Sequence, residues 1–208
     1  MKTKLLLIAL LFFPLTACAQ EVEPDRRYVE SSELKVKETD IVIGSKNAPI
    51  TLIEYSSLTC PHCANFHKTG FALLNDEYIK TNKVKYILRD FPLNAPALYA
   101  AKIAHCAGDE RYFDFIKTFF EWQEMWAFTN NYAQEIEKIA ALGGIAGEKY
   151  KACANNKQIE EFVLNRAMAA NKSLNIAETP TFFINGEKYT GEKNIEFFRK
   201  AFDEKLNK

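Results

Sequence analysis

A pair of cysteines separated by two residues, Cys60-Pro61-His62-Cys63, stands where a strand is expected to lead into a helix. The preceding stretch, Pro49 to Tyr55, is rich in residues that favour strands. Pro61 suits the first position of a helix, because its missing N–H has no partner to lose there. Apolar residues then recur at helical spacing to about Lys80, with a kink expected at Gly70. We therefore expect the cysteine pair at the N-terminus of a helix that follows a strand.

The rest of the chain returns to β-structure only after a long helical stretch. Short strands are expected over Ile41 to Ile43 and over Lys83 to Arg89, and residues 95–174 have helical patterns throughout. Thr181 to Ile184 and Glu187 to Thr190 then flank Asn185-Gly186, a strong hairpin signal. A last amphipathic helix follows from Ile195. This order predicts an α/β fold with a helical segment at about 92–174 inserted between its two β-containing parts.

The composition is that of a folded domain without a bias towards charged partners. The 208 residues are 48% hydrophobic and 26% charged, and basic and acidic residues number 27 each. A chain of this length has room for one compact domain. A formally neutral chain gives no indication of a nucleic acid or an anionic membrane surface as partner.

The N-terminus has the pattern of an export signal. Lys2 and Lys4 precede an apolar run from Leu5 to Leu15, which is too short to span a bilayer. One interpretation is a cleaved signal peptide over residues 1–19. The other is a lipoprotein signal over residues 1–17, in which Leu15-Thr16-Ala17-Cys18 resembles a lipobox and Cys18 is lipidated. Residues 20–40 are charged and are expected to form a linker or a short N-terminal arm before a domain at 41–208.

Five cysteines in an exported chain need to be divided between roles. Cys18 belongs to the signal region, and the spacing of Cys60 and Cys63 is that of a redox dithiol. Cys106 and Cys153 remain, and we expect them to form a structural disulfide in an oxidising compartment. The alternative is that these two are unpaired buried thiols.

A zinc half-site is another interpretation of Cys60 and Cys63. Zinc would need two more ligands, and the three histidines form no second ligand pair of familiar spacing. We therefore expect no metal and no cofactor other than the disulfide between the two cysteines.

Three features together resemble the DsbA-like branch of the thioredoxin superfamily. The first is the segment from Tyr55 to His67, which contains Cys-Pro-His-Cys, and the second is Glu178-Thr179-Pro180-Thr181-Phe182-Phe183-Ile184-Asn185-Gly186. The third is the helical segment between them. The resemblance covers residues 41–205 and implies a thioredoxin-like fold with an inserted helical domain.

Disulfide exchange requires a thiolate that attacks a sulfur atom. Cys60, at a predicted helix N-terminus, is the expected nucleophile, because the positive end of the helix favours an anion there. His62 lies between the two cysteines and is expected to add a donor or a positive charge. Cys63, one turn into the helix, is the expected resolving thiol. Stabilising the Cys60 thiolate stabilises the reduced dithiol, which favours oxidation of substrates.

The resemblance also assigns roles to three residues outside the cysteine pair. Pro180 matches the family's cis-proline, which faces the dithiol, and the backbone of Thr179 would then pair with an extended substrate chain. An ordinary trans proline is the alternative. Glu54 matches an acid buried beneath the active site that relays the proton of the resolving cysteine, and a solvated glutamate on an edge strand is its alternative. His67 is interpreted as a packed helix residue and not as a catalyst.

The expected function is the introduction of disulfide bonds into unfolded or reduced exported proteins. The resemblance implies re-oxidation by a quinone-linked membrane protein and a periplasmic location, either soluble or lipid-anchored through Cys18. About 20 residues precede the expected fold, which favours a monomer over the oligomers typical of isomerases. The alternatives are a disulfide isomerase or reductase on the same fold, and a non-enzymatic zinc-binding or peptide-binding module.

Overall fold

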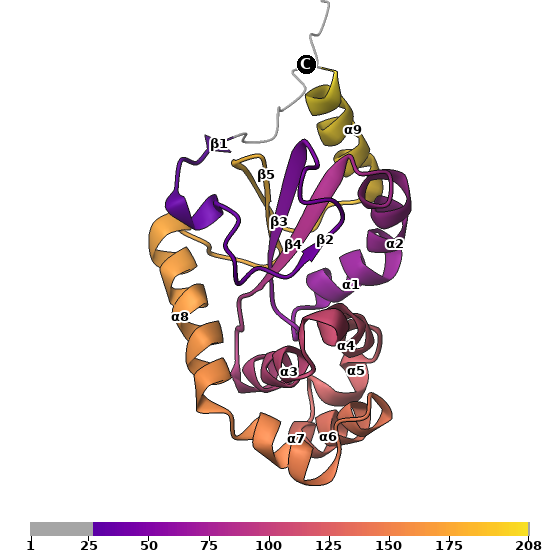
Figure 1. The fold of residues 1–208 in the computed structure, drawn as a ribbon, viewed down its shortest axis with the longest axis vertical. Helices are drawn as coiled ribbons and strands as arrows, with labels where there is room; N and C mark the ends of the chain where they lie inside the picture. Colours follow the sequence, from indigo (N-terminus) through magenta and orange to yellow (C-terminus); the bar gives the residue numbers. More distant parts are fainter. Residues whose placement is uncertain (1–26, 208) are drawn as a thin grey trace, which may run out of the picture.

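The computed structural model describes residues 27–207, and these form a six-stranded sheet flanked by helices (Figure 1). The strand order is β1-β6-β5-β3-β4-β2. β3 and β4 are parallel, and every other neighbouring pair is antiparallel. The strands are β1 (Arg27–Tyr28), β2 (Val42–Ile43), β3 (Ile50–Ser56), β4 (Val84–Asp90), β5 (Thr181–Ile184) and β6 (Glu187–Thr190).

The strands predicted from the sequence are confirmed, each within one residue of its observed bounds. The hairpin between β5 and β6 turns at Asn185 and Gly186, whose φ angles are 48° and 88°. A two-residue hairpin loop of this kind needs left-handed backbone at both positions, and asparagine and glycine adopt it most readily.

The helix after the cysteine pair is interrupted at Gly70, where a kink was predicted. The segment consists of α1 (Pro61–Thr69), α2 (Phe71–Leu74) and a π-helical turn (Asn75–Ile79). A Cβ atom at Gly70 would lie 3.3 Å from both the ring and the carbonyl oxygen of Phe66. The close packing of the chain against Phe66 therefore favours a glycine at the break.

A group of helices lies beyond the carboxyl ends of β3 and β4 (Figure 1). Three helices of the fold begin at an asparagine, Asn94, Asn156 and Asn194, whose side chain accepts a hydrogen bond from a backbone N–H of the first turn. Within residues 27–207, none of the helices combines the length and the apolarity that crossing a bilayer requires. The helices between β4 and β5 are α3 (Ala95–Cys106), α4 (Asp109–Glu121), α5 (Gln123–Trp126), α6 (Tyr132–Leu142), α7 (Gly147–Ala154) and α8 (Lys157–Leu174).

The two faces of the sheet pack against different helices. On one face, β3 contributes Leu52 to a large core shared with α1 and with α9 (Ile195–Leu206). On the other face, Ile53 and Tyr55 join a smaller core with residues of α8. Because side chains alternate along a strand, Glu54 points to the same face as Leu52. This alternation places Glu54 beneath the helix that begins at the cysteine pair.

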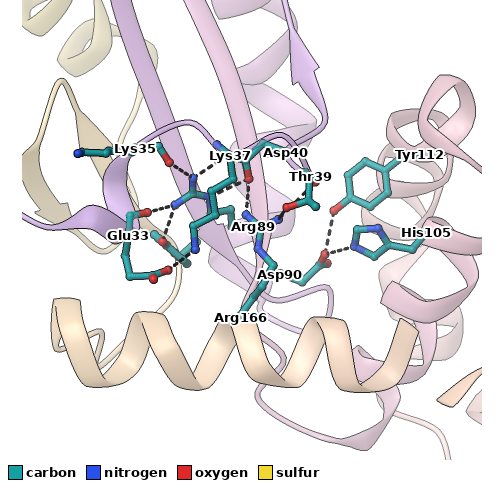
Figure 2. A network of polar contacts seen from close by, with 11 residues as sticks. Glu33, Lys35, Lys37, Thr39, Asp40, Arg89, Asp90, His105, Tyr112 and Arg166 are labelled. Carbon is teal, nitrogen blue, oxygen red and sulfur yellow. Dashed lines mark hydrogen bonds and ion pairs between the residues drawn. The ribbon is translucent and has the colours of Figure 1, made fainter. Parts of the chain in front are cut away.

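The segment before β2 is packed onto the α8 face through a buried network of charges (Figure 2). Arg89 of β4 is 4% exposed and contacts Asp40 through two hydrogen bonds, of 3.1 Å and 2.7 Å. Arg89 also donates to the carbonyl oxygen of Lys35 and to the hydroxyl of Tyr55, both at 2.9 Å. Arg166 of α8 binds Asp40 from the other side.

Residues 27–40 therefore belong to the folded unit and do not act as a linker to it. β1 adds to the sheet beside β6, and the Asp40 side chain is fully buried between two arginines. Of the two expectations for this segment, the short N-terminal arm describes residues 27–40, and the charged, aperiodic sequence left the linker open because Arg89 and Arg166 are distant in the sequence. The predicted signal segment and Cys18 lie outside the described residues.

Candidate active site

Cys60 occupies the N-cap position of α1, at the end of the loop that leaves β3. Its carbonyl oxygen accepts the first helical hydrogen bond, from the N–H of Ala64 at 3.1 Å, and Pro61 is the first helical residue. Cys60 is 5% exposed and Cys63 is fully buried, and both are free thiols. The two sulfur atoms therefore stand at a helix N-terminus with unequal access to solvent.

The surroundings of Cys60 favour its thiolate. A hydrogen bond from the Cys63 side chain is the largest cause that lowers the pKa of Cys60, to about 5, against the opposing effect of burial. The Thr179 side chain and the backbone N–H groups of Cys63 and His62 lower this pKa further. A thiol with a pKa of about 5 is roughly 99% ionised at pH 7.

The surroundings of Cys63, in contrast, disfavour its thiolate. Burial is the largest cause that raises the pKa of this thiol well above its ordinary value. The hydrogen bond to Cys60 and the charge of Glu54 raise it further. Two neighbouring groups whose pKa values are driven apart can divide the roles of nucleophile and proton carrier.

Pro180 follows a cis peptide bond, and Thr179 faces the cysteine pair. The Thr179–Pro180 bond is cis, and the Cys60 thiol donates to the carbonyl oxygen of Thr179 at 3.1 Å. The Thr179 hydroxyl is buried and has no hydrogen-bond partner among the described residues, so it is free to donate to a thiolate. Residues far apart in the sequence thus form one surface around Cys60.

His62 is held by an acidic residue that the sequence analysis did not identify. Its Nδ1 atom lies 2.7 Å from the carboxylate of Glu192, in the loop after β6, and Asn65 donates to the same carboxylate. The hydrogen bond with Glu192 is the largest cause that raises the pKa of His62. The predicted positive charge beside the cysteines is therefore favoured by a partner 130 residues away.

Glu54 is fully buried beneath α1, which contradicts the alternative of a solvated edge-strand residue. The hydroxyl of Tyr86 donates to its carboxylate at 2.5 Å, and His67 Nε2 lies 3.1 Å from the same oxygen atom. The other carboxylate oxygen has no hydrogen-bond partner among the described residues. His67 is packed, as predicted, with its ring stacked on Phe120 at a centroid distance of 4.3 Å.

A second residue missed by the sequence analysis ties the inserted helices to the cysteine loop. Gln123 of α5 is 2% exposed and donates to the carbonyl oxygens of Leu58 and Cys60, at 2.8 Å and 3.0 Å. In the sequence, Gln123 stands within an aromatic stretch without any motif. Only the packing of α5 against the loop reveals its role.

The other two described cysteines form the expected structural disulfide. Cys106 of α3 is bonded to Cys153 of α7, and their Cα atoms are 5.6 Å apart. The bond lies within the helical insertion and leaves Cys60 and Cys63 unconstrained. Between residues 27 and 207 the structure has no cluster of three or more metal-binding side chains of the His, Cys, Asp or Glu type.

Comparison with known proteins places this geometry in a family. The thioredoxin family model matches residues 36–204. A Rickettsia typhi protein named "Putative protein-disulfide oxidoreductase" is 36% identical over 173 residues, covering 83% of this chain and 64% of its own length. The chain thus spans slightly less than two thirds of that relative.

Two solved structures extend the comparison. Wolbachia pipientis α-DsbA1 is 34% identical with a TM-score of 0.79, covering 84% of this chain and 95% of that chain. A protein-disulfide isomerase from Novosphingobium aromaticivorans, 21% identical with a TM-score of 0.72, covers 80% of this chain and 97% of its own and shares the fold. The family model and the Wolbachia structure together show that this chain belongs to the DsbA-like branch of the thioredoxin superfamily.

Proposed function

We propose that this protein is a thiol–disulfide oxidoreductase that introduces disulfide bonds into exported proteins through Cys60 and Cys63. The observation that carries the proposal is the contrast between the two thiols. The pKa of Cys60 is lowered to about 5, whereas that of the buried Cys63 is raised. The names of the Rickettsia relatives and of Wolbachia α-DsbA1 support the same chemistry.

Cys60 is the atom that exchanges with substrate. A substrate thiolate attacks the Cys60 sulfur of the oxidised enzyme, the Cys60–Cys63 bond breaks, and a mixed disulfide forms between Cys60 and the substrate. The Cys63 sulfur leaves with the electron pair and takes up one proton. A second substrate thiolate then attacks the substrate sulfur and displaces Cys60, so that the substrate leaves oxidised and the enzyme holds a Cys60 thiolate and a Cys63 thiol.

The direction of electron flow follows from the stability of the Cys60 thiolate. A low pKa stabilises the reduced enzyme and makes its disulfide a stronger oxidant. The backbone at Thr179, whose carbonyl oxygen lies 3.1 Å from the Cys60 sulfur, supports an unfolded substrate chain as the partner. Glu54 is the acid that supplies or accepts the proton of Cys63.

The cellular setting of the proposal comes from the sequence. The N-terminal signal pattern supports a periplasmic enzyme, either soluble or anchored through a lipidated Cys18. The family resemblance supports re-oxidation by a quinone-linked membrane protein, and the enzyme is proposed to act as a monomer.

The redox equilibrium of Cys60 and Cys63 against glutathione tests the direction. We expect a potential above the roughly −180 mV of protein disulfide isomerase. A value near the roughly −270 mV of thioredoxin would contradict the oxidase assignment and favour a reductase. Strong refolding of a scrambled substrate by an oligomeric enzyme would instead favour an isomerase.

A further inference from the structure

The buried carboxylate of Glu54 has one oxygen atom engaged and one free. Its Oε2 atom accepts from Tyr86 at 2.5 Å and lies 3.1 Å from His67 Nε2. Its Oε1 atom is buried without a partner among the described residues. The Glu54 charge also acts on the buried Cys63 thiol. In the proposed function Glu54 supplies or accepts the proton of Cys63, and Oε1 is the oxygen atom that is free to do so.

A buried carboxylate that gains or loses a proton changes the charge of a site that water does not reach. Isolated buried charge is costly, so a compensating proton must move elsewhere. The Glu54 and Tyr86 side chains are 0% exposed, whereas the His67 side chain is 6% exposed. His67 is thus the member of this cluster that has contact with solvent.

We propose that His67 is a positioning residue that completes the proton path of Cys63, holding Glu54 in place and exchanging a proton with solvent as Glu54 exchanges one with Cys63. The inference rests on the proposed function. It goes beyond the role assigned to the buried acid, because it gives His67 a part in proton transfer in addition to packing.

The step balances when the mixed disulfide between Cys60 and a bound partner is resolved. Cys63 gives its proton to Glu54 Oε1, its sulfur bonds to the Cys60 sulfur, the bond between Cys60 and the partner breaks, and the partner leaves as a thiolate. One proton has then entered the pair of Glu54 and His67, and His67 releases one to solvent. The pair therefore has the same net charge before and after the step.

The packing around His67 holds its ring in a fixed orientation. Its ring stacks on Phe120 of α4 at 4.3 Å and on Phe71 of α2 at 5.1 Å. Of the groups recorded in contact with the ring, the titratable ones are Glu54 from β3 and Tyr86 from β4, whereas α2 and α4 contribute aromatic rings. Tyr112 of α4 and Cys63 of α1 interact with Glu54 at longer range.

A quenched-flow experiment separates the step in which His67 acts from the one in which it does not. Reduced protein is mixed with oxidised glutathione and quenched with acid, and mass spectrometry follows the Cys60–glutathione adduct. Formation of the adduct reports attack by Cys60, and its decay reports attack by Cys63. We expect the decay of the adduct, and not its formation, to depend on His67.

Two variants remove the imidazole in different ways. His67→Gln retains an N–H donor for Glu54, and His67→Phe retains a ring for the stack on Phe120. We expect both to slow adduct decay at neutral pH roughly tenfold. This is less than the 10²–10⁴-fold typical of direct acid–base catalysis, because Glu54 remains. Adduct formation should stay within about twofold of wild type.

His105→Gln is the matched control. His105 Nε2 contacts Asp90 at 2.7 Å and is 16% exposed, so it is a second shielded histidine–carboxylate pair in a different place. Its replacement should leave both rates within about twofold of wild type. If the adduct of His67→Gln decays at the wild-type rate, or if this variant slows adduct formation as much as decay, the role of His67 is wrong. If the wild type forms no adduct, the proposed function fails instead.

Discussion

The Cys60 sulfur lies 3.1 Å from the carbonyl oxygen of Thr179, to which it donates a hydrogen bond when protonated, and the contact joins positions 119 residues apart. The contact places the sulfur beside the backbone that precedes a cis-proline. A substrate strand that paired with Thr179 would replace this contact and bring its own cysteine to Cys60. The same position thus serves the protonated thiol and the incoming chain.

The stability of the reduced protein should depend on the ionisation of Cys60. The folded-state pKa is about 5, below the ordinary value of 9.0, so the thiolate stabilises the reduced fold fully above the ordinary value. This stabilisation is lost progressively as the pH falls to about 5. The ultraviolet absorbance of the thiolate should titrate with a midpoint near pH 5 and be absent in Cys60→Ser. A midpoint close to that of a free thiol would contradict the environment described for Cys60.

Loss of the Gln123 side-chain amide should destabilise the protein. Gln123→Leu leaves the carbonyl oxygen of Leu58 without its side-chain donor and that of Cys60 with Ala64 N–H alone, at a cost of about 1–3 kcal/mol in the free energy of unfolding. Gln134→Leu, at an exposed position of α6, should change it by less than about 0.5 kcal/mol. Urea denaturation of both variants measures the difference. Equal effects would mean that the Gln123 contacts contribute little.

Removal of Asp40 should release the arm from the α8 face. Asp40→Ala leaves Arg89 and Arg166 without their shared carboxylate, and breaking such a pair costs about 3 kcal/mol. Limited proteolysis should then cut near residues 31–40. Asp76→Ala, in an exposed pair with Lys80, is the control and should cost less than about 1 kcal/mol.

The contribution of Asp40 to the free energy of unfolding should also depend on pH. Burial acts to raise the pKa of Asp40, but hydrogen bonds from Arg89, the Lys37 N–H and Arg166 outweigh it, so the pKa is lowered from 3.8. The stabilisation is therefore present above that ordinary value and is lost as the pH falls below it. The stability difference between wild type and Asp40→Ala should narrow in strong acid, and a constant difference would contradict this.

The disulfide within the helical insertion should contribute to stability independently of Cys60 and Cys63. In the chain-entropy model, a bond across a separation of 47 residues stabilises a fold by about 4 kcal/mol. Replacing Cys106 and Cys153 by alanine in a Cys60→Ser background should lower the free energy of unfolding by up to this amount. Guanidinium denaturation measures it, and a loss below about 1 kcal/mol would show that the helices hold the insertion together without the bond.

Short stretches of sequence predicted the helices and strands, whereas several side chains of the candidate site are placed by contacts between distant residues. The Asn185-Gly186 turn and the break at Gly70 follow from backbone preferences that a few residues carry. Gln123 and Glu192 reach the cysteine loop across 63 and 130 residues, and no periodicity in the sequence reports such a contact. The pairing of Asp40 with Arg89 could not be predicted for the same reason. A charged stretch has the composition of a linker, and only the fold shows the residue with which it pairs.

The two outer strands of the sheet have a consequence for the proposed action on unfolded chains. As far as the structure describes the chain, β1 and β2 are each two residues long, so neither outer strand offers a long edge. Long exposed edge strands recruit further strands and lead to aggregation. Outer strands this short give an unfolded polypeptide little to add to. On the proposed function, they protect the protein from being incorporated into the assemblies of aggregation-prone polypeptides.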